Sequence, residues 1–342
     1  MAQPAIEAVD LEKTFAKGEV RALDGLSLSA EAGTVLGVLG PNGAGKTTAV
    51  RILSTILQPD RGRASILGHD VVKEAATVRR VIGLAGQYAT VDENLTGREN
   101  LLMVGRLTHI AKRDSLVRAD ELLEGFGLTD AANRPLKTYS GGMRRRLDLA
   151  AALVGRPPVL FLDEPTTGLD PQGRQDMWVT IEALVAAGTT LLLTTQYLEE
   201  ADRLAGRVVV VDHGKVIAEG TPAELKAGLG ETVVVVGLHD PAQARKAAAL
   251  LTGLTESAPH VDGSSVELTG RAGPRVATEV LRTLDAHAVE VTGLTLREPS
   301  LDDVFLLLTG HRAEAADGTD GSGAEQAALA RAMAGGGARG GR

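Results

Sequence analysis

A glycine-rich stretch, GPNGAGKTT, lies between a strand-like run and a helical run and constrains the fold more than any other feature. It fits the pattern G-x-x-x-x-G-K-[ST] from Gly40 to Thr47. Glycines let the backbone wrap tightly, so that successive N–H groups point at phosphate oxygens, and the following helix adds its positive dipole end. A chance match is the alternative, but the flanking strand and helix favour a phosphate loop in an α/β fold.

The loop supplies the first candidate site residues. Lys46 is predicted to contact the β- and γ-phosphates of a nucleotide, and Thr47 to give its hydroxyl to Mg²⁺. The predicted cofactor-binding residues of the loop are Gly40, Pro41, Asn42, Gly43, Ala44, Gly45, Lys46, Thr47 and Thr48.

The run VLFLDEP predicts the catalytic half of the same site. Its apolar residues deliver Asp163 at the carboxyl end of a buried strand, where open α/β sheets bind ligands. Asp163 is predicted to hold Mg²⁺, and Glu164 to orient and deprotonate the attacking water. Two acids at a solvated strand end are the alternative, which the phosphate loop weakens.

A second anion-binding stretch is predicted in YSGGMRRRLDLA. Ser140, Gly141 and Gly142 precede a helical run, and such a nest of N–H groups could cap the γ-phosphate held by a partner chain. A flexible turn is the alternative. The three arginines that follow, residues 144–146, are predicted to form a solvated helix face.

The remaining pattern predicts two domains. Residues 1–222 alternate strands and helices, with a helical insert from Val91 to Ala132, which favours a mostly parallel sheet covered on both faces. Residues 223–231 are predicted as a linker. Residues 232–310 follow the order β-α-β-β-α-β, that of a ferredoxin-like α+β domain. Residues 311–342 form a Gly/Ala-rich tail that is predicted to be disordered.

Composition excludes several classes of protein. The chain has no cysteine, which excludes disulfides and thiolate metal sites, and its net charge of −8 argues against nucleic-acid binding. Its seven histidines lack metal-ligand spacing. No apolar run approaches the roughly 20 residues of a membrane span. Any membrane role is therefore expected to come through a partner.

Together these motifs resemble the nucleotide-binding subunits of ABC transporters over roughly residues 5–225, the SGG stretch being similar to the L-S-G-G-Q signature. The resemblance implies an ABC-type P-loop NTPase fold with a parallel core sheet, an antiparallel β subdomain and a helical subdomain. It also implies ATP and Mg²⁺ as cofactors, with GTP left open, and a head-to-tail homodimer that holds two ATP molecules.

Four further residues acquire roles only through this resemblance. Phe15 fits the aromatic residue that stacks on the base, or else an edge-strand core residue. Gln87 fits the loop glutamine that touches Mg²⁺ or water and faces the membrane partner. Asp170, in TTGLD, fits the segment that crosses between subunits. Gln196 replaces the usual switch histidine; its amide can still contact the γ-phosphate but cannot become a cation, so hydrolysis is expected to slow rather than stop.

Two details narrow the resemblance to daunorubicin/doxorubicin-resistance-type exporters: the glutamine in TTQYLEEAD and the ending LREPSLDDVFLLLTG. Such ATP-binding subunits work with a separate permease at the cytoplasmic face of the membrane and expel amphipathic compounds. In SLDDVF, Ser300 is predicted to cap a helix whose first-turn acids complement its dipole, and the resemblance adds docking of this helix within the dimer. Tyr139 and Met143 depart from the leucine and glutamine of the signature, which leaves the affinity of the partner contact open.

Two other functions stay open. A soluble ABC ATPase acting on ribosomes or DNA is disfavoured by the single cassette and the lack of a heptad arm. A low-turnover regulatory subunit is supported by Gln196 alone and opposed by Lys46, Asp163 and Glu164. The exported compound is not encoded here, because it binds the permease.

Overall fold

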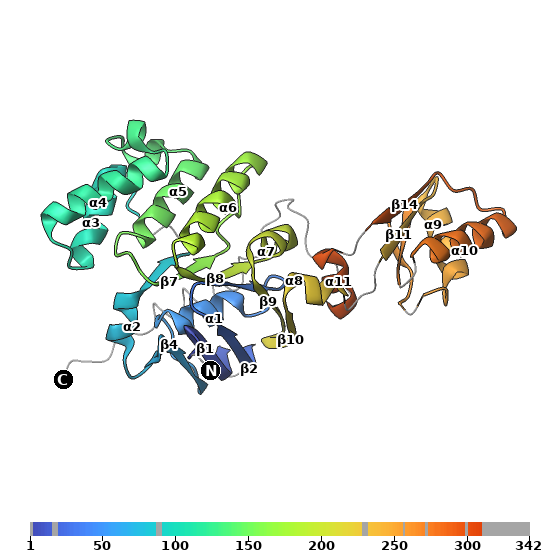
Figure 1. The fold of residues 1–342 in the computed structure, drawn as a ribbon, viewed down its shortest axis with the longest axis horizontal. Coiled ribbons are helices and arrows are strands. Elements are labelled where there is room, and N and C mark those ends of the chain that lie inside the picture. The colour runs from blue at the N-terminus through green and yellow to red at the C-terminus, as the bar shows by residue number, and fades with distance from the viewer. Residues whose placement is uncertain are drawn as a thin grey trace, which may run out of the picture.

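The computed structural model of the protein describes residues 3–15, 20–86, 91–227, 232–255, 257–270, 273–297 and 300–309. The predicted tail and the end of the predicted linker, residues 228–231, lie outside the described residues. Figure 1 shows a larger N-terminal part, in which several helices gather on one side of the strands, and a smaller part built from the C-terminal elements.

A six-stranded sheet forms the centre of the N-terminal part. Its order is β10-β9-β3-β8-β7-β6, with parallel pairing throughout except between β10 and β9. The strands are β3 (Val35–Leu39), β6 (Ile82–Ala85), β7 (Val159–Asp163), β8 (Thr190–Thr195), β9 (Arg207–Asp212) and β10 (Lys215–Gly220). Every residue of β3, β7 and β8 is buried, as expected for parallel strands that are covered on both faces.

A second, antiparallel sheet has the order β2-β1-β4-β5. Its strands are β1 (Ile6–Phe15), β2 (Val20–Ala30), β4 (Arg61–Ile66) and β5 (His69–Asp70). Helix α1 (Lys46–Leu53) shares one apolar core with this sheet and the central sheet, in which Leu26, Ile52 and Phe161 pack together. The helix that follows the phosphate loop is therefore held between two sheets.

The other helices of the N-terminal part pack on the core around α1, as the helix that contains Val78 does, or build a second core. They are α2 (Ala75–Val81), α3 (Gly97–Leu107), α4 (Lys112–Gly125), α5 (Gly141–Ala152), α6 (Pro171–Ala186), α7 (Leu198–Leu204) and α8 (Pro222–Ala227), with short 3-10 turns η2 (Thr129–Ala131) and η3 (Leu136–Thr138). Thr96 and Glu99 form a reciprocal capping box that starts α3. These elements confirm the predicted ABC-type arrangement of parallel sheet, antiparallel sheet and helical subdomain.

The C-terminal elements form an antiparallel sheet of order β12-β13-β11-β14. The elements are β11 (Thr232–Gly237), α9 (Pro241–Leu251), β12 (His260–Asp262), β13 (Ser265–Gly270), α10 (Gly273–Ala286) and β14 (Gly293–Arg297). This is the ferredoxin-like order that the sequence predicted. Val289 is buried beside the end of α10 and its N–H donates to the Leu284 carbonyl, so β14 starts only at Gly293.

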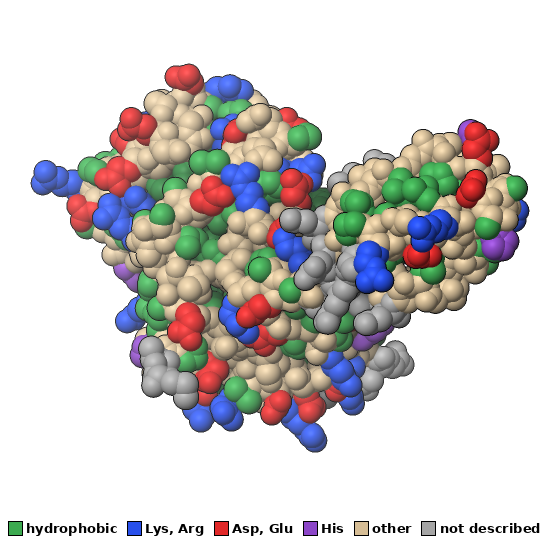
Figure 2. Space-filling model, turned by 45° about the vertical axis from the view of Figure 1, so that its right-hand side comes forward, with side chains coloured by type: hydrophobic (Ala, Val, Ile, Leu, Met, Phe, Trp, Pro, Cys, Tyr) green, Lys and Arg blue, Asp and Glu red, His purple; other side chains and the backbone are tan. Residues whose placement is uncertain are grey.

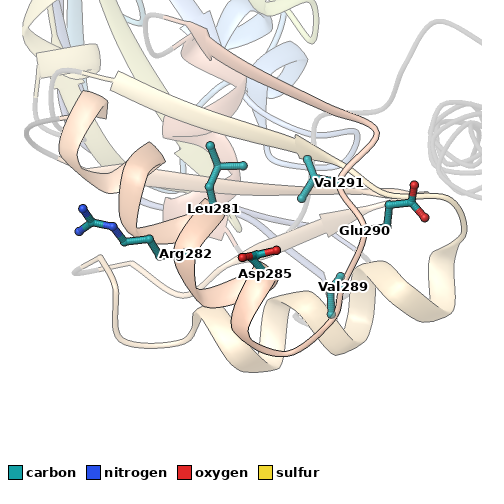
Figure 3. Close-up of a pocket in the computed structure, with 6 residues that line it drawn as sticks. All are labelled: Leu281, Arg282, Asp285, Val289, Glu290 and Val291. Carbon is teal, nitrogen blue, oxygen red and sulfur yellow. The ribbon is translucent and has the colours of Figure 1, made fainter.

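A shallow pocket of about 460 Å³ lies on this domain, between α10 and the segment before β14 (Figure 3). Its lining residues are Leu281, Arg282, Asp285, Val289, Glu290 and Val291, and the charged ends of Arg282 and Glu290 extend to opposite sides. Figure 2 shows a group of hydrophobic side chains on the visible face of the same domain. None of the residues predicted for the nucleotide site lines this pocket.

The final helix, α11 (Leu301–Thr309), packs on the N-terminal part and not on the C-terminal sheet. It contacts α7 and α8 (Figure 1), and Leu301 and Phe305 are buried in the core that those helices share. Arg297 fixes its start through two hydrogen bonds to Asp303, of 2.6 and 2.8 Å. The predicted 232–310 segment therefore reaches back to the nucleotide-binding domain. Within the described part of the chain, each helix is too short or too polar to cross a bilayer.

Candidate functional site

Three strands bring the predicted site residues to one edge of the central sheet. The parallel register pairs Leu39 with Thr195, and Asp163 with Thr194. The phosphate loop after β3, the acids at the end of β7 and Gln196 after β8 therefore all lie at the carboxyl ends of neighbouring strands. Ligands of open α/β sheets bind at this edge.

The phosphate loop has the backbone shape that its glycines predicted. Gly43 and Gly45 have φ angles of 79° and 104°, in the left-handed region that favours glycine. A Cβ atom on Gly40 would lie 2.3 Å from the carbonyl oxygen of Val211, and one on Gly45 would lie 2.4 Å from that of Ala22. Side chains are excluded at both positions, so the loop forms a cradle of backbone N–H groups at the start of α1 that fits a nucleotide's phosphates.

Lys46 lies inside this cradle. Its residue is 4% exposed, and its ammonium group donates to the carbonyl oxygens of Gly40 (2.8 Å) and Pro41 (3.0 Å). The same nitrogen is 3.6 Å from Oε1 of Glu164. The loop cation and the predicted general base therefore face one another across the place where the terminal phosphate would bind.

The predicted Mg²⁺ ligands also come together. Thr47 Oγ1 donates to Asp163 Oδ1 at 3.2 Å, and Thr194 donates to the same oxygen. A hydroxyl and a carboxylate are the oxygen donors that Mg²⁺ accepts, usually one or two from the protein with the rest from water and phosphate. Consistently, the described residues contain no cluster of three or more His, Cys, Asp or Glu side chains that could hold a metal alone. Gln87, the other predicted ligand, lies outside the described residues.

Glu164 is held in an unusual backbone conformation. Its φ angle is 52°, although it is not glycine, and its residue is only 8% exposed. Its N–H donates to the Thr194 carbonyl at 3.0 Å, and Thr167 Oγ1 donates to its Oε2 at 3.3 Å. Such conformations persist only where surrounding contacts enforce them, and they concentrate at functional sites.

The prediction of a solvated face for the three arginines of α5 is wrong, most clearly for Arg145. Its guanidinium donates to the backbone carbonyls behind the two acids, and burial lowers its pKa while nearby carboxylates, Asp148 foremost, oppose that shift. Arg144 bonds Glu93, and Arg146 bonds the Phe126 carbonyl. Helix geometry was the missed signal, because three consecutive residues span about 200° of a helix and cannot share one exposed face.

The signature stretch starts α5. Ser140 is its N-cap and accepts a hydrogen bond from the Met143 N–H at 3.3 Å, so its side chain sits among the free N–H groups of the first turn. Tyr139, which replaces the usual leucine, is buried, and its hydroxyl donates to the Ala131 carbonyl at 2.7 Å. The tyrosine thereby ties the signature to the helical subdomain and leaves the anion nest intact.

Gln196 is half-buried directly after β8, one residue past the strand pairing with β3. Helix α7 follows, and Glu200 within it is fully buried. Burial raises the pKa of Glu200, and Trp178 Nε1 donates to its Oε1 at 3.1 Å. The sequence interpretation missed this glutamate; its position within an otherwise apolar helix face was the available signal.

The last two candidates show structural contacts. Phe15 ends β1 and is half-buried, with the Lys13 ammonium 5.9 Å from its ring centre. Asp170 is the N-cap of α6 and accepts from the Gly173 N–H at 3.1 Å. Base stacking by Phe15 and a nucleotide contact by Asp170 stay predictions.

Comparison with known proteins agrees with the resemblance to ABC transporter ATP-binding subunits. The ABC transporter family pattern matches residues 23–167, and that of the C-terminal domain of DrrA1-3-like ATP-binding proteins matches residues 220–309. The daunorubicin/doxorubicin resistance ATP-binding protein DrrA of Streptomyces peucetius is 53% identical over 91% of this chain and 94% of its own. The Nod factor export ATP-binding protein I of Burkholderia thailandensis is 41% identical over 84% of this chain and 92% of its own.

Solved structures agree with the fold. An ATP-binding subunit of an ABC transporter superimposes with a TM-score of 0.60 at 26% identity and covers 66% of this chain and 92% of its own. A dimeric ATP-binding cassette in a post-hydrolysis state with ADP and Pi gives 0.58 at 25% identity, covering 63% and 98%. With its phosphate loop, paired acids, signature helix and DrrA-like C-terminal domain, the chain belongs to the ATP-binding proteins of ABC transporters.

Proposed function

We propose that this protein hydrolyses ATP with Mg²⁺ and thereby powers the export of a drug-like or amphipathic compound through a separate membrane permease. The observation that carries the proposal is the intact catalytic arrangement: Lys46 Nζ lies 3.6 Å from Glu164, and Thr47 bonds Asp163 beside them. A chain that only sensed nucleotide would not need a buried, conformationally constrained base next to the phosphate cradle.

Each residue of the site has a distinct role in ATP hydrolysis. The loop N–H groups and Lys46 bind the β- and γ-phosphates, and Glu164 accepts a proton from the attacking water. Gln196 contacts the γ-phosphate with a neutral amide. Mg²⁺, held by Thr47 and Asp163, would neutralise charge on the phosphate oxygens.

The partners follow from the two anion sites of the chain. Ser140 lies at the start of α5 and the phosphate loop at the start of α1, so each can serve a different nucleotide in a head-to-tail homodimer. The dimeric ADP-bound neighbour and the relatives named for daunorubicin and doxorubicin resistance and for Nod factor export support dimerisation and export. The proposal places the protein at the cytoplasmic face of the membrane, bound to its permease.

Transport into inside-out vesicles tests this function. Vesicles that contain the protein and a co-expressed permease of the drug-exporter type should accumulate daunorubicin only with Mg²⁺-ATP. Vesicles with Lys46→Met, or with the permease alone, should not. ATP turnover without accumulation of any tested amphipathic compound, together with binding to ribosomes, would instead support the soluble ATPase.

A further inference from the structure

Arg145, in the second turn of α5, joins the signature helix to the backbone of the catalytic strand. Its guanidinium donates to the carbonyl oxygens of Asp163 (3.1 Å), Glu164 (2.5 Å) and Pro165 (2.7 Å). A fourth bond of 2.6 Å reaches the carbonyl of Gly86, the residue before Gln87. The five N–H donors of a guanidinium form a rigid planar fork, so these bonds hold three segments in one fixed relation.

The surroundings of Arg145 compensate a largely buried charge. Its side chain is 16% exposed, and Asp148 Oδ2 lies 3.7 Å from Nη1. Glu200, one turn beyond Gln196, is fully buried and interacts electrostatically with the same guanidinium. Burying a cation is unfavourable unless it is paired, and Arg145 faces carboxylates from α5 and α7 as well as four carbonyl dipoles. The cluster therefore connects α5, the end of β7 and α7.

We propose that Arg145 is a positioning residue that transmits displacement of the signature helix to Glu164 of the same chain. Ser140 caps the start of the helix on which Arg145 lies, so a phosphate that docks at this end moves α5 and Arg145 together. Glu164 has a constrained backbone, and a small shift of its carbonyl changes where its carboxylate points. The inference rests on the proposed function: in the dimer, Arg145 would report the partner's ATP to this chain's own base.

The chain contains a built-in reporter of this cluster. Trp178 is its only tryptophan, and it donates to Glu200 at 3.1 Å. Its fluorescence therefore reports on the environment of Glu200 and can respond to nucleotide without any turnover.

Replacement of Arg145 by lysine in the full-length protein tests the proposal. Lysine keeps the charge, but its donors leave from one atom and cannot hold four carbonyls. We expect kcat to fall about tenfold to a hundredfold while KM for ATP changes less than about threefold, because the base is misplaced and the phosphate cradle is not. The matched control is Arg146→Lys, whose parent residue makes a 3.4 Å bond to the Phe126 carbonyl; its kcat should stay within about twofold.

The proposal is overturned if Arg145→Lys keeps the parental kcat or if its loss lies in KM. Arg145→Gln serves as a second variant in case the lysine variant unfolds; if neither has the parental melting temperature, Arg145 only supports the fold and the proposal fails. If the unmodified protein does not hydrolyse ATP, the proposed function is wrong, but this inference is not thereby overturned. In that case Mg²⁺-ATP should still change Trp178 fluorescence in the parent and in Arg146→Lys but not in Arg145→Lys, and an equal response in all three would overturn the inference.

Discussion

The two domains bury different kinds of side chain. The nucleotide-binding domain buries charged residues, among them Lys46, Asp148, Asp163, Glu164 and Glu200. Among the described residues between 232 and 297, by contrast, every buried side chain is apolar. Burying an ion costs several kcal/mol unless partners compensate it, so charged interiors indicate chemistry and aliphatic ones indicate a scaffold. The first domain therefore holds the charged interior that catalysis needs, and the second domain has an interior of aliphatic side chains alone in its described residues.

The largest expected effect follows from replacing Glu164, the buried residue that we propose as the catalytic base. Glu164→Gln should lower the rate of phosphate release by about 10²- to 10⁴-fold, because an amide cannot accept the proton from water. ATP affinity should persist, since the phosphate cradle is unchanged. Steady-state phosphate release and equilibrium ATP binding measure the two quantities.

The control for this prediction comes from the other domain. Glu290→Gln replaces an acid beside the C-terminal pocket and should leave turnover unchanged. If both variants behaved like the parent, the charged interior of the first domain would not be the catalytic one.

The second effect concerns stability of the aliphatic domain. Leu284 is fully buried and Leu281, one turn earlier on α10, is 43% exposed. Leu284→Ala should destabilise the domain by about 2–5 kcal/mol, and Leu281→Ala by less than about 1 kcal/mol. Hydrogen exchange of the β11 and β13 amides measures the loss. Equal losses would mean that this core is not where the structure places it.

The third effect separates two roles at Gln196: a contact with the γ-phosphate and the ability to carry a positive charge. Gln196→Ala should slow ATP hydrolysis by about tenfold, because it removes the amide that we propose contacts the γ-phosphate. Gln196→His should lose less or gain, since histidine also offers a donor and can become a cation. Single-turnover rates compare the variants. Parental turnover in the alanine variant would refute phosphate sensing by this residue.

The smallest effect concerns the helix that joins the domains. Burial tends to raise the pKa of Asp303, but bonds from Arg297 and Ser300 outweigh it and hold this pKa below its usual value. A carboxyl with a lowered folded pKa stabilises above its unfolded pKa, about 3.9, and loses that contribution as pH falls through the folded value. Docking of α11 should therefore weaken below about pH 4.

Hydrogen exchange of the α11 amides, corrected for the intrinsic pH dependence, measures this docking. Asp303→Asn should weaken it by about 1 kcal/mol at pH 7 and remove the acid transition. The exposed neighbour Asp302, changed to asparagine, loses a first-turn charge but not the bonds from Arg297 and Ser300, so it should weaken docking less than Asp303→Asn. An acid transition that survives in Asp303→Asn would assign the pH dependence to another group.

Much of the site was predictable because its signals are local. The phosphate loop, the acids after β7 and the signature nest each depend on a few adjacent residues that shape their own backbone. Chain order likewise predicted the ferredoxin-like topology, since β-α-β connections allow few arrangements. The sequence shows that Tyr139 departs from the signature. Only the folded protein shows that its hydroxyl donates to the Ala131 carbonyl.

The sequence by itself determined the fold class and the nucleotide chemistry, and it proposed the residues that carry this chemistry. The tertiary structure decided what contacts between distant segments create: the four carbonyls held by Arg145, the pairing of Glu200 with Trp178, and the return of α11 to the first domain. Helix periodicity could have indicated that Arg145 and Glu200 face inward, but it does not say which groups they meet there. Their partners lie far away in the sequence, so only the packing of distant segments brings them together.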